Sequence, residues 1–247
     1  MILEKTLLDK MKKGTVHFAL IDPENQTYEE AGRLAVRMKE AGTDAFMIGG
    51  STGITSENLD GTAVAIKKSS GLPTIYFPSS PKALPTKVDA MFFMSIVNSI
   101  DPNFIIGYHA KVAPVVKKYK LECISMGYII IEPGMKVAKM GKAKPIGHND
   151  IELAVGYAMA CEYFGMHMVY LEAGSGADSP VSPEMIAAVK KAVNIPVIVG
   201  GGIRTPEAAA IARKAGADAI VTGTFVEKCN DDGILKKVVA AAKGTGE

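Results

Sequence analysis

Glycine and small hydroxyl residues gather at three points of the sequence where an apolar run ends. The first turn runs from Glu172 to Gly176, the second is Gly200-Gly201-Gly202, and the third is Thr222-Gly223-Thr224. Glycine has no Cβ, so backbone N–H groups in such turns can come close to a ligand. Each turn leads toward a helix N-terminus, which favours negative charge. One such turn alone would predict only a tight bend, whereas the set predicts a phosphate site and a small phosphorylated ligand.

Two carboxylates follow predicted strands and add chemistry to that site. Asp22 ends the first apolar run, and Glu172 ends the run before the first glycine-rich turn. Alone, either carboxylate could cap a helix or pair with a cation, but at one shared site one can hold a divalent cation while the other takes a proton. Ser51 follows the second apolar run, next to Asp22 in strand order. A carboxylate, a hydroxyl and water suit Mg²⁺, which binds largely through phosphates.

Eight short apolar runs alternate with amphipathic segments along the 247 residues and must position these side chains. Continuous apolar runs are typical of a parallel sheet that helices cover. Such units predict an α/β fold, a TIM-type (βα)8 barrel whose active site lies at the carboxyl ends of the strands; the alternative is a doubly wound open sheet. No linker divides the chain, so we expect one domain over residues 1–247. The predicted strands are 16–22, 44–50, 73–79, 89–95, 121–134, 166–174, 195–202 and 218–224.

Two connections depart from the regular alternation. Residues 80–88 join two predicted strands and contain prolines, so no regular third helix fits there. We expect the missing helix to open an apolar groove beside strands that carry Phe77, Phe92 and Phe93, with room for the hydrocarbon tail of a substrate. Residues 132–150 form the longest connection without a predicted helix, and its lysines either cover an anionic ligand as a lid or face water.

Composition and charge exclude several classes of protein. A formal net charge of +2 and the absence of a basic arm disfavour nucleic-acid binding. Three cysteines without a C-x-x-C spacing predict neither a disulfide framework nor a zinc site, and they favour a cytoplasmic protein. No uncharged apolar run reaches about 18 residues, so we predict no transmembrane segment. The four histidines show no metal-binding spacing, and we expect His17 and His167 to be structural.

Several motifs carry, in this order, a resemblance to a known family: ALIDPE, FMIGGS, YFPSSP, VYLEAGSGA, VGGGIRTPE and DAIVTGT. With them the chain resembles the geranylgeranylglyceryl phosphate synthases over nearly its whole length, and YLEAGSGA with the Asp-Pro of the first strand is the specific part. The resemblance implies a modified (βα)8 barrel without a regular third helix. It also implies a prenyltransferase that joins geranylgeranyl diphosphate to the C3 hydroxyl of sn-glycerol 1-phosphate with Mg²⁺. This reaction forms the first ether bond of archaeal membrane lipids and releases diphosphate.

The resemblance implies roles for individual residues as well. Asp22 and Ser51 would bind Mg²⁺, and Glu172 would bind a glycerol hydroxyl and help to remove its proton. A homo-oligomer, either a dimer or a hexamer, is expected. The residues expected to hold sn-glycerol 1-phosphate are Tyr170, Leu171, Glu172, Ala173, Gly174, Ser175, Gly176, Gly201, Gly202, Gly223 and Thr224.

Other functions fit part of the same pattern. An isomerase or lyase that acts on a sugar phosphate would use the same phosphate site but needs no apolar groove. A barrel that only binds a phosphorylated ligand is a further alternative, against which Asp22, Ser51 and Glu172 argue together. A relative that uses a longer prenyl diphosphate would differ only in the groove, whose length the sequence pattern does not determine.

Overall fold

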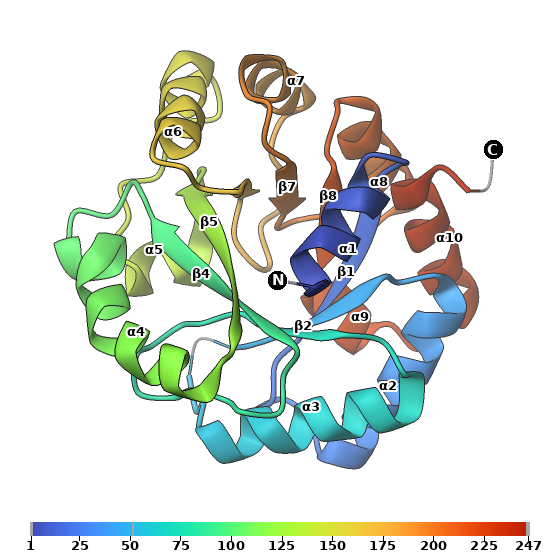
Figure 1. Ribbon diagram of the computed structural model, residues 1–247. Helices are drawn as coiled ribbons and strands as arrows, with labels where there is room; N and C mark the ends of the chain where they lie inside the picture. Colours follow the sequence, from blue (N-terminus) through green and yellow to red (C-terminus); the bar gives the residue numbers. More distant parts are fainter. Residues whose placement is uncertain (1, 51, 246–247) are drawn as a thin grey trace.

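Eight parallel strands close into a barrel in this computed structural model, which describes residues 2–50 and 52–245 (Figure 1). Each strand pairs with the next in chain order, and β8 returns to pair with β1, with Ala219 opposite Val16. The predicted (βα)8 barrel is therefore confirmed over the open sheet. The strands are β1 (Val16–Ile21), β2 (Ala45–Ile48), β3 (Thr74–Tyr76), β4 (Ala90–Ile96), β5 (Glu122–Ile130), β6 (Met168–Glu172), β7 (Val197–Gly200) and β8 (Ala219–Thr222).

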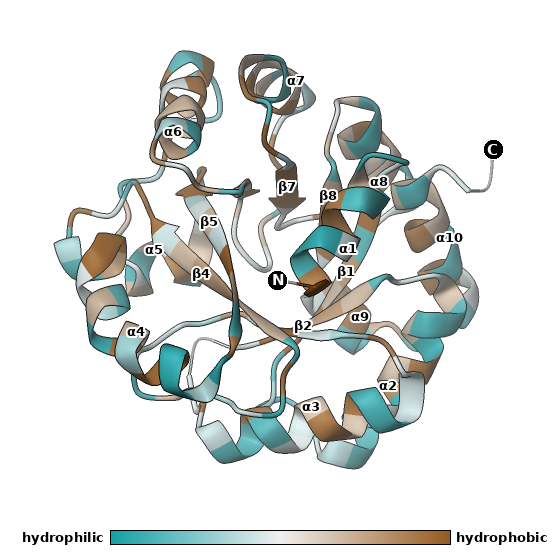
Figure 2. Ribbon diagram, in the orientation of Figure 1, coloured by the Kyte–Doolittle hydropathy of each residue, from teal (hydrophilic) through white to brown (hydrophobic). Residues whose placement is uncertain are grey.

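The strands are mostly apolar because both of their faces are buried. Successive side chains of a strand point to opposite faces. Phe18 of β1 accordingly belongs to a cluster inside the barrel, whereas its neighbour Ala19 belongs to a cluster that also contains residues of the covering helices. Figure 2 shows the result, with mostly brown strands and with teal residues on the surrounding helices.

Helices surround the barrel, and several of them begin at a residue whose side chain caps the helix. Thr27 and Thr55 each accept a hydrogen bond from the third residue of the helix that follows, and each forms a capping box. Asp150 caps its helix by accepting from Leu153 N. The helices are α1 (Ile2–Met11), α2 (Tyr28–Ala41), α3 (Ser56–Ser70), the π-helical turn η1 (Asn103–Gly107), α4 (Tyr108–Tyr119), α5 (Met135–Met140), α6 (Ile151–Tyr163), α7 (Pro183–Ala192), α8 (Pro206–Lys214), α9 (Thr224–Lys228) and α10 (Asp232–Lys243).

Helix α1 closes the amino-terminal end of the barrel. Leu7 and Met11 are buried in the interior cluster. The Glu122 carboxylate at the start of β5 accepts hydrogen bonds from the first amides of the helix, at 2.9 Å from Ile2 N and 2.8 Å from Glu4 N. The carboxyl ends of the strands remain available for a site.

The two histidines expected to be structural belong to this amino-terminal half of the barrel. His17 is fully buried, and its ring nitrogens each lie 2.9 Å from a threonine hydroxyl, of Thr43 and of Thr222. Burial lowers the pKa of His17 to about 3, so the ring is neutral at neutral pH. His167 Nδ1 lies 2.5 Å from a carboxylate oxygen of Glu4 and holds α1 in place. Their structural role is confirmed.

The connection between β3 and β4 contains no helix, as predicted. Residues 77–89 instead follow an irregular path beside α3. The Asp60 carboxylate of α3 accepts hydrogen bonds from the backbone amides of Thr86 and Lys87, at 2.7 and 2.8 Å. The segment is therefore held by a neighbouring helix rather than by its own regular structure.

The connection over residues 132–150 was predicted without a helix, and that prediction is wrong in part. Helix α5 occupies Met135–Met140 and begins at Gly134, whose φ is 65°. A helix of this length is too short to show a 3.6-residue period in the sequence. Val137 and Ala138 pack against the interior cluster, so contacts with distant parts of the chain stabilise it.

Candidate active site

Two cavities meet at the carboxyl ends of the strands, where the glycine-rich turns lie. The larger has a volume of about 670 Å³ and extends toward residues 77–89 and α4. The smaller, of about 40 Å³, lies among the turns that follow β6, β7 and β8. The two cavities are adjacent, and some residues line both of them; we call these residues the shared wall. This shared wall consists of Leu20, Glu172, Ser175, Gly223 and Thr224.

Bare backbone and hydroxyl groups line the smaller cavity. Gly201 and Gly202 have φ values of 84° and 73°, a conformation that residues with a side chain rarely adopt. A Cβ on Gly201 would lie 2.5 Å from Glu172 Oε1, so a larger residue would displace the acid. The hydroxyls of Ser175 and Thr224 lie 2.6 Å apart at the other side. The glycines thus keep the cavity open for a small polar group.

The residues predicted to hold glycerol phosphate occupy different environments. Leu171 and Ala173 are buried in the cluster between the strands and the outer helices, and Gly174 donates its N–H to Glu172 Oε1 at 2.7 Å. Arg204 and Phe225 also line the cavity, and only Arg204 had a sequence signal, because it closely follows the three glycines. The predicted residues that line the smaller cavity are Tyr170, Glu172, Ser175, Gly176, Gly201, Gly202, Gly223 and Thr224.

Glu172 is the buried acid of the shared wall. Its Oε2 accepts a hydrogen bond from the Tyr128 hydroxyl at 3.0 Å, and its Oε1 accepts from Gly174 N. Burial raises the pKa of Glu172, and hydrogen bonds from Gly174, Tyr170 and Tyr128 oppose that rise. Burial and the neighbouring Glu172 charge raise the pKa of both tyrosines well above the usual value, so their hydroxyls stay protonated. Glu172 is therefore positioned to accept a proton from a molecule in either cavity.

Asp22 follows β1 and lines the larger cavity. Its Oδ1 accepts a hydrogen bond from Glu24 N at 3.0 Å, whereas Oδ2 accepts none from any described residue. Burial raises the pKa of Asp22, and the Glu24 amide and the Lys136 charge oppose this rise. A Cβ on Gly50 would lie 2.2 Å from Asp22 Oδ1, so glycine at position 50 gives the carboxylate its room. Ser51 lies outside the described residues, and its role as a metal ligand stays a prediction.

The donor set around Asp22 fits a hard cation that shares its ligands with a substrate. Within 2–50 and 52–245, no group of three or more His, Cys, Asp or Glu side chains could hold a metal ion. One carboxylate oxygen without a hydrogen-bond donor, next to Thr52 in the cavity wall, suits Mg²⁺, which keeps waters and takes further ligands from phosphates.

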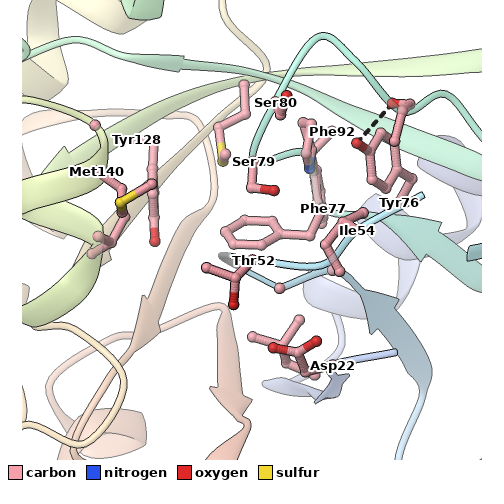
Figure 3. Close-up of a pocket in the computed structure, with 18 of the residues that line it drawn as sticks. Asp22, Thr52, Ile54, Tyr76, Phe77, Ser79, Ser80, Phe92, Tyr128 and Met140 are labelled. Carbon is pink, nitrogen blue, oxygen red and sulfur yellow. Dashed lines mark hydrogen bonds between the residues drawn. The ribbon is translucent and has the colours of Figure 1, made fainter. Parts of the chain in front are cut away.

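Lys136 of α5 brings a positive charge to the same part of the larger cavity. It lines the cavity, and its Nζ lies 3.5 Å from Thr52 Oγ1. Figure 3 shows Thr52 beside Asp22 at the polar end of the cavity. An anion bound at this end would therefore meet a lysine as well as the Asp22 site.

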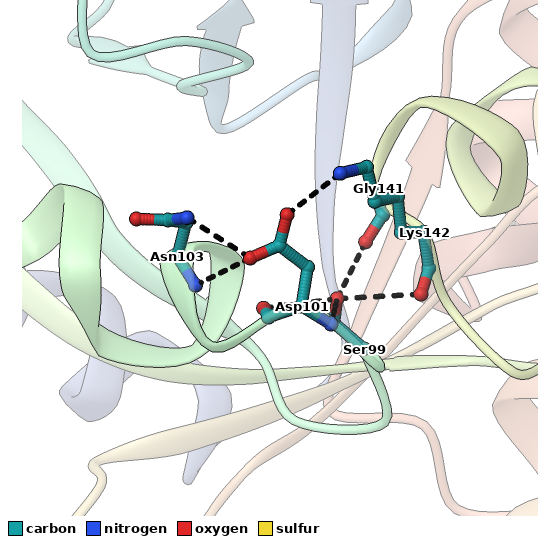
Figure 4. Close-up of polar contacts among 5 residues, drawn as sticks. All are labelled: Ser99, Asp101, Asn103, Gly141 and Lys142. Atoms are coloured by element: carbon teal, nitrogen blue, oxygen red, sulfur yellow. Dashed lines mark hydrogen bonds and ion pairs between the residues drawn. The ribbon is translucent and has the colours of Figure 1, made fainter.

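A polar network holds the end of α5 in place (Figure 4). Lys142 forms an ion pair with Asp101 at 2.8 Å, and the Ser99 hydroxyl donates to the Gly141 carbonyl at 2.7 Å. The Lys142 hydrogen bond holds the pKa of Asp101 below its usual value. Of the predicted lysine-rich lid, Lys142 thus anchors α5 to the loop after β4, while Lys136 faces the cavity.

Aromatic side chains fill the middle of the larger cavity (Figure 3). The Phe77 ring lies edge-on to two neighbours, with its centroid 5.5 Å from that of Tyr128 and 6.4 Å from that of Phe92. The Tyr76 hydroxyl donates to the Ala83 carbonyl at 3.0 Å and ties the helix-free segment to the cavity wall. The apolar space predicted beside the missing helix is therefore present.

Fold and site together define a phosphate-binding type of (βα)8 barrel, in which a glycine-lined pocket opens onto a large apolar cavity. The chain belongs to the PcrB family, whose pattern matches residues 8–242. The geranylgeranylglyceryl phosphate synthase of Thermococcus gammatolerans is 52% identical over 226 residues, which cover 92% of this chain and 90% of that relative. The enzyme of the same name from Methanosarcina mazei is 50% identical over 234 residues, or 94% and 95% of the two chains.

Solved structures agree with this family. The crystal structure of (S)-3-O-geranylgeranylglyceryl phosphate synthase from Thermoplasma acidophilum, in complex with its substrate sn-glycerol-1-phosphate, matches with a TM-score of 0.94. It is 42% identical, and the match covers 97% of each chain. Thiamine phosphate pyrophosphorylase from Pyrococcus furiosus, at 14% identity and a TM-score of 0.61 over 94% of this chain and 97% of that one, shares the fold alone. Within the described residues, none of the helices combines the length and apolar character needed to cross a bilayer.

Proposed function

We propose that this chain is a geranylgeranylglyceryl phosphate synthase. It joins C1 of geranylgeranyl diphosphate to the C3 hydroxyl of sn-glycerol 1-phosphate and releases diphosphate. The observation that carries the proposal is the wall around Glu172, which a small polar cavity and a large apolar cavity share. Curated relatives of that name at 52% and 50% identity support it, as does a solved relative that holds sn-glycerol-1-phosphate.

The smaller cavity would hold sn-glycerol 1-phosphate by its phosphate. Backbone amides at Gly201 and Gly223 and the Thr224 hydroxyl supply hydrogen-bond donors, and Arg204 supplies a positive charge in the cavity wall. A phosphate fixed there would direct the glycerol chain toward Glu172 on the shared wall. Such fixed orientation converts the attack into an effectively unimolecular step.

The larger cavity would hold the prenyl chain, with the diphosphate facing Asp22 and Lys136. Aromatic side chains such as Phe77 and Phe92 would contact the hydrocarbon. We propose that Asp22 holds Mg²⁺ together with the predicted ligand Ser51. When bound, the cation supplies charge neutralisation for the departing diphosphate. Lys136 adds a fixed charge of the same sign.

The ether bond forms when the C3 oxygen of the glycerol attacks C1 of the prenyl donor. The bond between C1 and the diphosphate oxygen breaks, and its electron pair leaves with the diphosphate. Glu172 accepts the hydroxyl proton, while Tyr128 and Gly174 hold its carboxylate in place. Positive charge develops at the allylic C1, and aromatic rings such as Tyr128 stabilise it.

We also propose that the chain forms a homo-oligomer, a dimer or a hexamer. Large apolar side chains at the surface support association, since Ile100, Ile106 and Phe164 are 76%, 62% and 81% exposed. Light scattering on the purified protein measures the state directly. A monomer at micromolar concentration would contradict this part of the proposal.

A product assay tests the proposed reaction. The protein is incubated with sn-glycerol 1-phosphate and a series of prenyl diphosphates from C10 to C35, with Mg²⁺ or with EDTA. We expect ether-linked product and diphosphate release, most with the C20 donor and none with EDTA. Absence of product with every donor would contradict the proposal. Preference for the longest donors would identify a relative that uses a longer chain.

A further inference from the structure

Glu227 lies on α9, the short helix after β8, and its carboxylate holds the loop that carries Asp22. We propose that Glu227 is a positioning residue: through it, occupation of the smaller cavity sets the position of Asp22 in the larger one. The inference rests on the proposed function, because that function assigns glycerol phosphate to the smaller cavity and the donor diphosphate to the surroundings of Asp22.

The first part of the connection is the contact between Glu227 and the loop after β1. Glu227 Oε1 accepts a hydrogen bond from the backbone N of Asp22 at 2.8 Å, and Oε2 accepts from Asn25 Nδ2 at 3.1 Å. Gln26 Nε2 lies 3.4 Å from Oε1. Because one bond goes to the amide of Asp22 itself, a shift of Glu227 moves the residue that bears the ligand carboxylate. Both oxygens are engaged by the loop, so Glu227 supports Asp22 from a position that also lines the larger cavity.

The second part is the position of α9 beside the smaller cavity. Gly223 and Thr224 stand at the start of the helix and line this cavity, and the Thr224 hydroxyl lies 2.6 Å from that of Ser175. Glu227 follows Thr224 by three residues, which places it next to Thr224 on the adjacent helical turn. Val226 between them is completely buried in the core. The helix is therefore anchored at its centre; its start lines both cavities, whereas Glu227 lines the larger one only.

The shielding of the Glu227 contact makes it suited to transmit a shift. Burial raises the pKa of Glu227, and the hydrogen bond from the Asp22 amide is the main effect that opposes the rise. Hydrogen bonds in a partly buried site compete less with water than exposed ones do. A charge-assisted bond between a carboxylate and an amide is also among the stronger kinds. Movement at one end of α9 is thus expected to reach Asp22.

Coupling of this kind predicts that the two ligands bind cooperatively. A phosphate bound at Gly223 and Thr224 would order α9, and Glu227 would then hold Asp22 in the position that binds the cation and diphosphate. By linkage, the effect is reciprocal between the two ligands. Glu227 does not line the smaller cavity, so removal of its side chain should abolish the coupling and leave the phosphate contacts in place.

Calorimetry tests the coupling without turnover. The probe for the larger cavity is inorganic diphosphate with Mg²⁺, which cannot react with sn-glycerol 1-phosphate; Asp22→Ala should abolish its binding and so locate it. In the unmodified protein, saturating sn-glycerol 1-phosphate should tighten diphosphate binding by at least about five-fold. In Glu227→Ala the ratio by which sn-glycerol 1-phosphate tightens diphosphate binding should fall below about two-fold. The Kd of sn-glycerol 1-phosphate measured alone should stay within about two-fold of that of the unmodified protein. Glu227→Gln, which keeps an acceptor for the Asp22 amide, should retain part of the ratio.

Matched variants separate positioning from general damage. Glu184→Ala makes the same change in an exposed first turn, that of α7, and should keep the full ratio. If Glu227→Ala does not fold, Asn25→Ala removes one bond to Glu227 and should reduce the ratio. Full coupling in a folded Glu227→Ala protein, or in Asn25→Ala, overturns the inference and leaves the proposed function intact. An unmodified protein that binds neither ligand overturns the proposed function and the inference with it.

Discussion

At the scale of single residues, Glu172 combines a stability cost with a chemical use. Its side chain is buried, with the whole residue only 6% exposed, and burial raises its pKa. The ionised form is the one that can accept a proton, yet it is also the form that burial disfavours. Hydrogen bonds from Gly174, Tyr170 and Tyr128 keep this charged form accessible. Activity at this position is therefore expected to oppose stability.

We expect Glu172→Gln to separate the two effects. The loss of the proton acceptor should lower kcat by about 10²- to 10⁴-fold. Because the folded-state pKa of Glu172 lies above the ordinary value of 4.5, the unmodified protein loses stability as pH rises through that folded pKa. The glutamine variant has no such loss, so its Tm relative to that of the unmodified protein should rise as the pH increases above 4.5. Turnover assays measure kcat, and thermal scans at several pH values measure Tm. Near-normal turnover, or a Tm difference that does not change with pH, would refute the assignment.

Tyr128→Phe should change the pH dependence of the reaction. The Tyr128 hydroxyl stabilises the ionised form of Glu172, so its removal raises the pKa of Glu172 further. The acid limb of the kcat/KM profile should therefore move to higher pH. Tyr163→Phe makes the same change at a residue that is 76% exposed, and its profile should match that of the unmodified protein. An unshifted acid limb in Tyr128→Phe would show that this hydroxyl does not set the protonation of Glu172.

At the scale of elements, the lysines of α5 and of the turn that follows it have two uses. The end of α5 is fixed by the ion pair of Lys142 with Asp101, and this leaves Lys136 at the cavity. Lys139 on the same helix does not line the cavity. Because the helix is anchored at one end, it can hold the ammonium group of Lys136, near its other end, close to the Asp22 site.

Lys136→Ala should weaken use of the prenyl diphosphate selectively. The loss of one charged contact to the diphosphate corresponds to about 10-fold or more in KM for that substrate. The KM for sn-glycerol 1-phosphate should stay the same, because its proposed site lies among the turns after β6, β7 and β8. Lys139→Ala removes an equal charge from the same helix and should leave both constants unchanged. Equal effects of the two substitutions would indicate a long-range electrostatic effect of positive charge rather than a local contact of Lys136 with the diphosphate.

At the scale of the whole molecule, one end of the barrel contributes to stability and the other end carries the candidate active site. Helix α1 and Glu122 close the amino-terminal end, whereas both cavities lie at the carboxyl end. This separation is common in (βα)8 barrels and follows from the direction of the parallel strands. Changes at the closed end should therefore alter stability without altering the reaction.

Glu122→Ala tests that separation. The substitution removes the acceptor for the first amides of α1 and should cost about 1–2 kcal/mol of unfolding free energy. For a chain of this size that amounts to a fall in Tm of roughly 2–8 °C. The kcat at 25 °C should stay within a factor of two of the unmodified value. A large loss of kcat in a folded variant would show that the closed end does affect the site.

The sequence predicts some of these features and not others, for physical reasons. Strands such as β7 could be predicted because burial on both faces requires a continuous apolar run. Asp22 and Glu172 could be predicted as neighbours because the carboxyl ends of parallel strands meet at one rim. Helices α5 and α9 could not, since they are too short for a period and depend on core contacts of Val137 and Val226. Nothing in the sequence marks the bond of Glu227 to an amide 205 positions away.

The absence of a helix over residues 77–89 has a consequence for how this family can vary. This segment forms one wall of the larger cavity, and hydrogen bonds to Asp60 hold it from outside the barrel. Under the proposed function, a change in this segment should therefore alter the length of the tail that is accepted and leave the turns after β6, β7 and β8 as they are.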